Sequence, residues 1–456
     1  MEMSNRACHS TILASVVIAA LGGFLVGFDM AVLSGASGAL KNYFLLNDLS
    51  FNIVVASALI GTVFGAVVAG RLADLIGRRG TLLVIAFIYL ISALGCATAW
   101  SSQVLVVARA LSGVGIGAAS VVVPLYIAEI APANKRGQLV SIFQLNIVIG
   151  ILASFVSNYL IALAPQSEEA AWRWMLGVVA IPSGLYLILL LLIPESPRWL
   201  VLKGRPHEAV EILTQLGVLQ STDKVAAIRA SLSQEALAGR EHLFQSKYSR
   251  PLLLVWVLAM FNQLSGINAL MYYAPAIFAM AGAGRDSSLL QSIAVGAVCV
   301  LFTIAAMLMI DVVGRRMLIR IGSIGMGICM LIVAWQFSLP LGWDRAMILL
   351  GLLGFIAFFS LSQGAVIWVF ISEIFPNAIR AKGQSFGATI HWGMAMLISW
   401  IFPMVAGGCP CIAFVFFALL MFLQLIWALY IMPETNGRSL EEVQDFSPSH
   451  HEENWS

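Results

Sequence analysis

Twelve apolar segments, each about as long as a bilayer-spanning helix, constrain the fold of this chain more than any other feature. A helix needs about 20 predominantly apolar residues to cross the hydrocarbon core of a membrane. Hydrophobic residues make up 60% of the chain and charged residues only 11%, which excludes an ordinary soluble enzyme. We therefore predict an all-α membrane protein with spans at residues 11–38, 51–73, 80–100, 103–127, 138–162, 173–193, 251–281, 288–310, 317–337, 346–371, 384–406 and 410–432.

A charged stretch separates the first six segments from the last six. Residues 194–250 carry many charges, with leucine and isoleucine at helical spacing, which predicts short amphipathic helices rather than a span. The predicted organisation is an N-terminal six-helix half over residues 1–193, a helical linker over 194–250, a C-terminal six-helix half over 251–432 and a tail over 433–456.

Lysine and arginine are distributed unevenly among the loops. If both termini face the cytoplasm, the inside segments hold 20 of the 25 basic residues, and the outside loops hold only Lys41, Arg173, Arg285 and Arg345. This bias predicts that the termini and the linker are cytoplasmic, in a cell inner (plasma) membrane. The net charge of +2 gives no reason to expect a nucleic acid partner. We expect the chain to act as a monomer in the lipid bilayer.

Three motifs occur twice at nearly one offset. Asp74-x-x-Gly-Arg-Arg recurs from Asp311, Glu129-x-x-Pro recurs from Glu373, and Pro194-Glu-Ser recurs as Pro433-Glu-Thr. The offsets are 237, 244 and 239 residues, and every copy lies at a predicted cytoplasmic end. Such parallel repeats indicate two six-helix halves with the same orientation, an architecture of transporters whose substrate site lies between the halves.

The repeated motifs resemble those of the major facilitator superfamily, and Pro194–Leu200 and Pro433–Arg438 resemble its sugar porter family. Phe261–Asn268 and Trp368–Pro376 extend the likeness. Within that family the chain is similar to bacterial proton-linked xylose, arabinose and glucose symporters. The resemblance implies the major facilitator fold and a proton-coupled monosaccharide importer that works by alternating access. It is then not an enzyme. No nucleotide-binding loop occurs, and neither a cofactor nor a metal is expected.

Three other functions stay open at this stage. The chain could be a facilitative uniporter of a sugar or of a polyol such as inositol. It could be a non-transporting sensor of the same fold, although sensors usually append a long signalling tail and only 23 residues follow Pro433. A drug efflux antiporter would have an apolar cavity rather than one lined by the amide side chains described below.

Two charged residues lie deep within apolar segments, well away from the segment ends. Asp29 is in the first and Arg109 in the fourth, where a lone charge costs roughly 2.5–3.5 kcal/mol on insertion scales. We therefore expect them to face each other. One interpretation is a structural ion pair. The other, which the resemblance to proton-coupled sugar porters favours, is a proton switch in which protonation of Asp29 releases Arg109.

Amide and aromatic side chains within the apolar segments form the predicted sugar site, because sugar hydroxyls need polar partners in dry surroundings. Gln263 and Asn268 can meet one ligand only if their helix breaks, for which Ser265–Gly266 is the candidate. The alternatives are interhelical hydrogen bonds for the amides and packing for the tryptophans. By resemblance, the substrate-binding residues are Gln144, Asn262, Gln263, Asn268, Tyr272, Trp368, His391 and Trp392, with Phe359 as a further lining candidate.

Four positions depart from the family's usual residues. Asn262 stands in place of a glutamine, Cys299 in place of a sugar-binding asparagine, and His391 in place of an asparagine or glutamine. Ile151 resembles the glucose transporters rather than the xylose symporter. His391 has three open interpretations, namely a neutral donor to sugar, packing, or a second proton site. The identity of the sugar is open for the same reason.

Charged residues of the cytoplasmic motifs are predicted to form salt bridges that close an inner gate. Exposed pairs of this kind contribute about 0–1 kcal/mol each, which suits a gate that must open. The predicted gate residues are Glu129, Arg136, Glu195, Glu373, Arg380 and Glu434.

Overall fold

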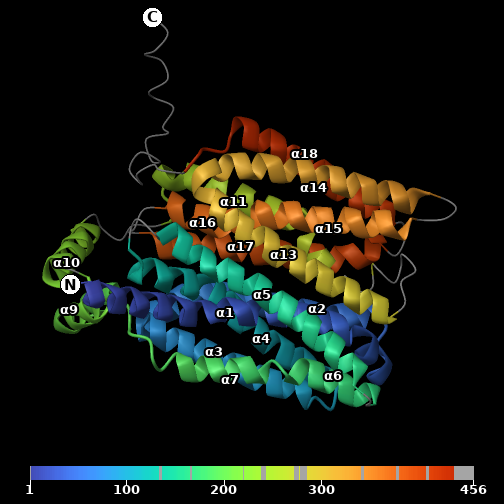
Figure 1. Ribbon diagram of the computed structural model, residues 1–456, viewed down its shortest axis with the longest axis horizontal. Coiled ribbons are helices and arrows are strands. Elements are labelled where there is room, and N and C mark those ends of the chain that lie inside the picture. Colours follow the sequence, from blue (N-terminus) through green and yellow to red (C-terminus); the bar gives the residue numbers. More distant parts are fainter. Residues whose placement is uncertain are drawn as a thin grey trace, which may run out of the picture.

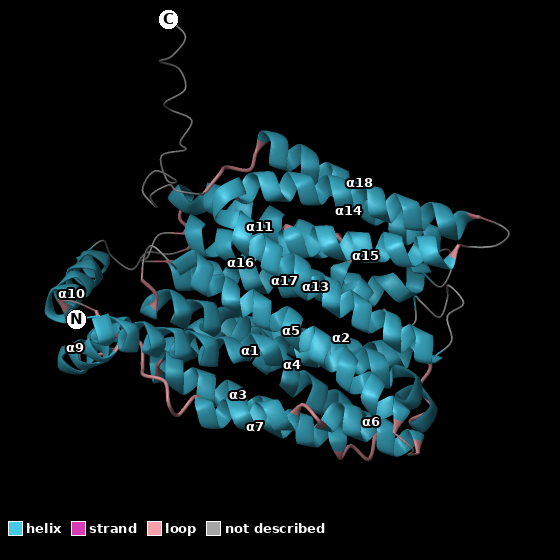
Figure 2. Ribbon diagram, in the orientation of Figure 1, coloured by secondary structure: helices cyan, strands magenta, loops and turns pink. Residues whose placement is uncertain are grey.

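The computed structural model describes residues 2–132, 136–164, 167–218, 220–237, 243–271, 277, 285–339, 344–375, 379–406 and 410–435. Throughout these ranges every regular element is a helix, as Figure 2 shows. Twelve helical stretches among the described residues are long and apolar enough to cross a membrane. The predicted all-α membrane fold is therefore confirmed.

The N-terminal half contains seven helices in its described residues, because its sixth span is divided. Pro182 lacks an N–H and its ring clashes with the carbonyl four residues earlier, so the helix breaks at Val178–Val179. The helices are α1 (Glu2–Tyr43), α2 (Asp48–Ile76), α3 (Arg78–Ala97), α4 (Ser102–Ile130), α5 (Arg136–Leu163), α6 (Glu168–Gly177) and α7 (Ala180–Leu189).

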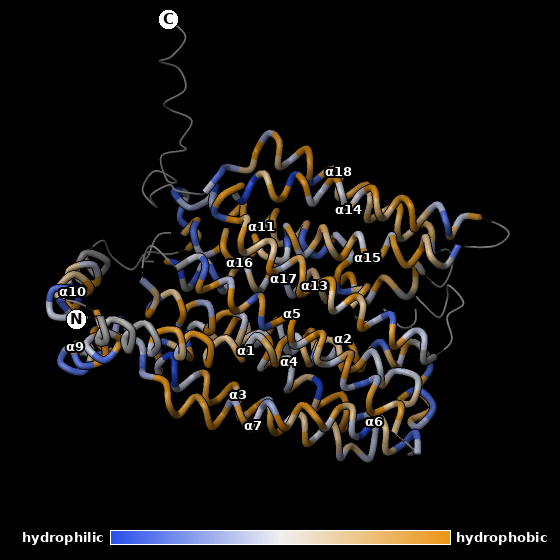
Figure 3. Tube along the Cα trace, viewed as in Figure 1, coloured by the Kyte–Doolittle hydropathy of each residue, from blue (hydrophilic) through white to orange (hydrophobic). Residues whose placement is uncertain are grey.

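Short helices follow, as the charged stretch predicts. They are α8 (Pro197–Leu202), α9 (Pro206–Gln215), α10 (Ser221–Leu237) and the 3₁₀ turn η2 (Ser246–Tyr248). They bury a small core of their own around Trp199, Leu200 and Leu213. Figure 1 shows α9 and α10 beside the N-terminus at one end of the bundle, and Figure 3 shows hydrophilic as well as hydrophobic residues along them. We call this end of the molecule the linker end.

The C-terminal half is also interrupted within one predicted span. The predicted span at residues 346–371 lies within one membrane-length helical stretch, Ala346–Ile374, and inside it the chain turns at Ser362, whose hydroxyl donates to the Phe358 carbonyl at 2.6 Å. The helices of this half are α11 (Ser249–Leu264), α13 (Arg285–Val313), α14 (Arg315–Ser338), α15 (Arg345–Leu361), α16 (Gln363–Ile374), α17 (Arg380–Ala406) and α18 (Pro410–Tyr430).

The two halves lie side by side and meet where α5 packs on α13 and α2 packs on α17 (Figure 1). Within the N-terminal half, glycines bring α2 and α4 into backbone contact. A Cβ added to Gly117 would lie 1.9 Å from the Thr62 carbonyl oxygen, and one added to Gly61 would lie 2.0 Å from that of Ala110. Lipid supplies no hydrophobic drive for helix association, so such close van der Waals packing, together with interhelical hydrogen bonds, holds the spans together.

Candidate functional site

A cavity lies between the two halves and is lined by residues of both. Helices α1 and α5 supply one wall, and α11, α13, α15, α16 and α17 supply the others. Tyr272 lies outside the described residues. The other seven predicted substrate-binding residues all line this cavity: Gln144, Asn262, Gln263, Asn268, Trp368, His391 and Trp392. Phe359 and Cys299 line it as well.

The predicted helix break is confirmed at Ser265–Gly266. Helix α11 ends at Leu264, and Gly266 has a left-handed backbone with φ of +86°. A Cβ at Gly266 would lie 2.6 Å from the Phe417 ring, so both conformation and space require glycine. The break turns Asn268 back toward α11, where its Nδ2 donates to Gln263 Oε1 at 2.6 Å. Two amides five residues apart thereby reach one cavity.

The seventh and eleventh spans share a buried polar cluster. Gln263 Nε2 donates to Asn262 Oδ1 at 3.1 Å and to a ring nitrogen of His391 at 2.9 Å. The imidazole of His391 packs between two indoles, with ring centroids 5.2 Å from Trp368 and 4.9 Å from Trp392. All of these side chains are at most 7% exposed. The cluster presents amides beside aromatic rings, the two kinds of surface that a sugar's hydroxyls and C–H groups require.

Three hydrogen bonds between described residues join the halves, two of them at the cavity. Trp368 Nε1 donates to Gln144 Oε1 at 3.1 Å, and Trp392 Nε1 donates to Ser120 Oγ at 3.1 Å. Ser385 Oγ, near the start of α17, donates to the Ala66 carbonyl of α2 at 2.6 Å. The two halves are therefore in direct contact at the cavity and on the side of the cavity where α17 begins.

Asp29 of α1 and Arg109 of α4 form the expected ion pair. Arg109 Nη1 lies 2.9 and 2.8 Å from the two Asp29 carboxylate oxygens, and Ser112 Oγ donates to Asp29 at 3.3 Å. Asp29 is 5% exposed and Arg109 is 1% exposed. Val26 and Met30, on the same helix as Asp29, line the cavity. A change at the ion pair therefore acts on a helix that forms part of the cavity wall.

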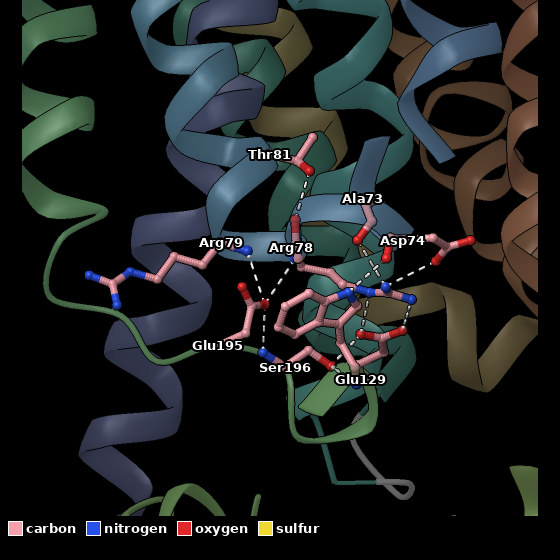
Figure 4. A network of polar contacts seen from close by, with 10 residues as sticks. Ala73, Asp74, Arg78, Arg79, Thr81, Glu129, Glu195 and Ser196 are labelled. Atoms are coloured by element: carbon pink, nitrogen blue, oxygen red, sulfur yellow. Dashed lines mark hydrogen bonds and ion pairs between the residues drawn. The ribbon is translucent and has the colours of Figure 1, made fainter. Parts of the chain in front are cut away.

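The first copy of the charged motifs forms one network at the linker end, shown in Figure 4. Arg78 donates to both oxygens of Glu129 at 2.9 Å and to Asp74 at 3.1 Å. Glu195 accepts the backbone N–H groups of Arg78 and Arg79 at 2.9 and 3.1 Å. Glu195 thereby stabilises the start of α3, where the backbone N–H groups have no partner within the helix and the helix dipole favours a negative charge.

The second copy repeats this network with equivalent residues. Arg315 donates to the two oxygens of Glu373 at 3.1 and 2.7 Å and pairs with Asp311 at 3.0 Å. Glu434 accepts the backbone N–H groups of Arg315 and Arg316, each at 2.9 Å. The sequence repeat therefore corresponds to a structural repeat, in which one arginine of each half joins three segments.

These networks differ from the expected gate in two respects. The described ion pairs of Glu129 and Glu373 are formed within a half rather than between halves. The expectation of an exposed pair is wrong for Glu129, because three chain segments converge on it; its side chain is 7% exposed, and its partner Arg78 is 6% exposed. Arg380 begins α17, and the side chain of Arg136 lies outside the described part.

Several buried polar residues of the C-terminal half were missed. Gln363 Nε2 donates to Gln424 Oε1 at 2.5 Å, and Ser323 Oγ donates to the same oxygen at 3.2 Å. The Gln363 carbonyl in turn accepts Asn262 Nδ2 at 3.2 Å, which links this pair to the cavity. Both glutamines lie within apolar segments, so the criterion that selected Gln144 would also have selected them. The central arginines, Arg78 and Arg315, lie in motifs that the repeat had already singled out.

The chain matches known transporters over nearly its whole length. Residues 15–446 match the family described as Sugar (and other) transporter. The arabinose-proton symporter of Bacillus subtilis is 38% identical over 432 residues, covering 93% of each chain. The solved structure of the proton:xylose symporter XylE bound to 6-bromo-6-deoxy-D-glucose superposes with a TM-score of 0.86 at 34% identity, covering 95% of this chain and 98% of that one.

An inward-open structure of XylE from E. coli superposes less closely, with a TM-score of 0.81 at 33% identity, covering 95% and 99% of the two chains. The sequence match to this family is consistent with the structure. The described residues include twelve candidate spans, two repeated halves and a cavity between those halves. The chain belongs to the Sugar (and other) transporter family, the sugar porters of the major facilitator superfamily.

Proposed function

We propose that this protein imports a monosaccharide together with a proton by alternating access, through rocking of residues 1–193 against residues 251–432. The observation that carries the proposal is the placement of the Asp29–Arg109 pair. It is buried in the membrane-spanning part of the chain, on a helix whose neighbouring residues line the cavity. The names of the similar proteins, which include arabinose-proton and proton:xylose symporters, support the same function.

The cavity has the chemistry for sugar binding. Asn262, Gln263 and Asn268 offer amide donors and acceptors, which match hydroxyl groups that would otherwise be unpaired in a dry site. Trp368 and Trp392 offer aromatic faces for the C–H groups of a pyranose ring. His391, held by Gln263, adds a polar ring between the two indoles.

Coupling follows from the charge state of Asp29. The charged carboxylate holds Arg109 and so ties α1 to α4. A proton on Asp29 removes the charge that Arg109 balances, and α1 loses its ion pair with α4. Val26 and Met30 are four residues apart on one face of α1, so a shift of that helix moves the cavity wall. Sugar and proton thereby act on the same conformational equilibrium.

The conformation described here has its halves in contact between the cavity and the linker end. The Ser385–Ala66 hydrogen bond joins them there, between the start of α17 and the cavity residue His391, and the chain superposes better on the sugar-analogue complex than on the inward-open structure. We infer that the linker end is the cytoplasmic side and is closed in this state. The termini then lie in the cytoplasm, the protein resides as a monomer in an inner (plasma) membrane, and the linker-end networks around Glu129 and Glu373 hold each half rigid as the gate opens.

The test is uptake of labelled pentoses, hexoses and inositol into proteoliposomes with and without an imposed pH gradient. The proposal predicts accumulation of at least one monosaccharide above its external concentration, abolished by a protonophore. Uptake that only equilibrates, whatever the pH gradient, would indicate a facilitative uniporter. Preference for inositol would indicate a polyol carrier, and absence of uptake with retained binding would indicate a sensor.

A further inference from the structure

The hydroxyl of Tyr89 is buried in the membrane-spanning part of the chain without a hydrogen bond. Tyr89 lies on α3, within the candidate span Arg78–Ala97, and is 0% exposed. Its Oη has no hydrogen-bond partner among the residues that the structure describes. A hydroxyl in dry surroundings costs free energy unless it is paired, and a phenylalanine would fill the same space without that cost. The hydroxyl is accounted for if it gains a partner in another state of the transporter.

Tyr89 lies near the Asp29–Arg109 ion pair. A Cβ added to Gly115, which follows Arg109 on α4, would lie 3.3 Å from the Tyr89 ring, so the ring packs against the backbone of that helix. The phenol group interacts electrostatically with Asp29 of α1, Arg109 of α4 and Tyr186 of α7. The ionisable groups that act on Tyr89 therefore include both members of the ion pair.

Neighbouring groups are less suited to a new hydrogen bond than the Tyr89 hydroxyl is. The Tyr186 hydroxyl already donates to a backbone carbonyl of α1, at 3.2 Å. Cys96, further along α3, interacts electrostatically with Arg109 and Asp29, but a thiol is a weak donor and a weak acceptor. The Tyr89 hydroxyl can both donate and accept, and nothing in the described part of the chain occupies it.

A proton on Asp29 changes what its carboxyl group requires. The charged carboxylate accepts from Arg109 Nη1 at both oxygens, whereas the neutral carboxyl gains an O–H donor that needs an acceptor. Ser112 Oγ lies 3.3 Å from Asp29, but it belongs to α4, so a bond to it would keep α1 in its present place. A bond to Tyr89, on α3, would give α1 a second position.

We propose that Tyr89 is the hydrogen-bond partner of Asp29 in its protonated state, so that proton binding transfers Asp29 from Arg109 on α4 to Tyr89 on α3. The inference rests on the proposed function, because it specifies one contact of the same coupling step. The hydroxyl then stabilises the proton-loaded state and not the charged one. Replacing Tyr89 by phenylalanine removes that hydroxyl alone, so it should weaken only the protonated state.

A double-mutant cycle on the purified full-length protein tests this contact without transport. Asp29→Asn supplies a neutral side chain that, like the protonated carboxyl, both donates and accepts. Tyr89→Phe should leave the melting temperature of the otherwise unmodified protein unchanged or raised, and should lower that of Asp29→Asn by about 1–3 °C, the loss of one hydrogen bond. Tyr126→Phe is the matched control. The Tyr126 hydroxyl donates to the Pro194 carbonyl at 2.8 Å, so its loss should lower both melting temperatures equally.

Two results of the cycle would overturn the proposal. One is an equal effect of Tyr89→Phe in both backgrounds, which would indicate a structural role. The other is coupling of Asp29→Asn to Ser112→Ala in place of Tyr89→Phe, which would make the serine the partner.

The pH profile of sugar uptake into proteoliposomes is the second measurement, and it carries the test if Asp29→Asn does not fold. Losing a bond that forms only in the protonated state makes the proton harder to bind. The pH of half-maximal uptake should therefore fall by about 0.5–1 unit in Tyr89→Phe and stay unchanged in Tyr126→Phe. An unchanged pH of half-maximal uptake in Tyr89→Phe would contradict the proposal. If the unmodified protein takes up no sugar, or does so equally at every pH, the proposed function fails instead, and the cycle still reports whether Asp29 and Tyr89 interact.

Discussion

Replacing Asp29 by asparagine removes the negative charge of the buried ion pair while keeping the shape of the side chain. Arg109 is 1% exposed and donates from Nη1 to both carboxylate oxygens, so the variant leaves a buried charge without its counterion. Removing one partner of such a pair costs about 3–5 kcal/mol. If the ion pair forms only in the state described here, a loss of about 3 kcal/mol shifts the conformational equilibrium about 100-fold away from it.

The same substitution removes the carboxylate that carries the proton. One proton crossing about 100 mV contributes about 2.3 kcal/mol, which corresponds to roughly 40-fold accumulation of sugar for one-to-one coupling. In proteoliposomes we expect Asp29→Asn to lose this accumulation and to retain sugar counterflow, which requires no net proton movement. Asp223→Asn, on the exposed face of α10, serves as the matched control and should accumulate sugar normally.

A double variant separates stability from coupling. Asp29→Asn together with Arg109→Gln removes both charges, so it should recover much of the thermal stability that the single variant loses, because no unpaired charge is left buried. It should still fail to accumulate sugar. Uphill uptake by Asp29→Asn at the level of the unmodified protein would refute the reasoning, whatever its stability.

The other predictions concern the amides and the helix packing. Gln263→Ala should weaken sugar binding by about 1–3 kcal/mol through lost hydrogen bonds, measured by calorimetry, and Gln103→Ala on the exposed start of α4 should leave the affinity unchanged. Gln424→Leu strips a buried amide of its partner and should lower stability by about 1–3 kcal/mol, seen as a lower melting temperature in detergent; an unaltered melting temperature would show that the glutamine pair is not stabilising. Gly117→Ala should sharply reduce the yield of folded protein because the added Cβ would overlap the Thr62 carbonyl oxygen. Gly70→Ala, with open space around it, should be tolerated. Equal yields of the two variants would contradict the packing argument.

The sequence was sufficient for the fold because each span carries its own signal. Bilayer thickness sets the length of every apolar segment, and loss of water forces each one to be helical. The details that the sequence did not predict are local. The turn at Ser362 and the bond from Gln363 to Gln424 of α18 are examples, since no pattern within α15 or α16 alone reveals them.

The site was predictable to the extent that its chemistry is unusual for a membrane interior. Gln144, Asn268 and His391 stand out among apolar neighbours, and the structure gathers them around one cavity. The partners of the charged motifs were not predictable in this way. Glu195 bonds to backbone N–H groups of Arg78 and Arg79 more than a hundred residues away, a contact set by how the chain folds back rather than by residue type.

Sugar-driven proton movement tests the central claim most directly. Proteoliposomes containing a pH-sensitive dye are exposed to a sugar that the protein binds, with no pH gradient imposed and with the membrane potential held at zero by a permeant ion other than the proton. Our account predicts that adding the sugar acidifies the lumen, that the acidification is absent in Asp29→Asn, and that a protonophore dissipates it. Sugar entry into the vesicles of the unmodified protein with no change in lumenal pH would contradict proton coupling.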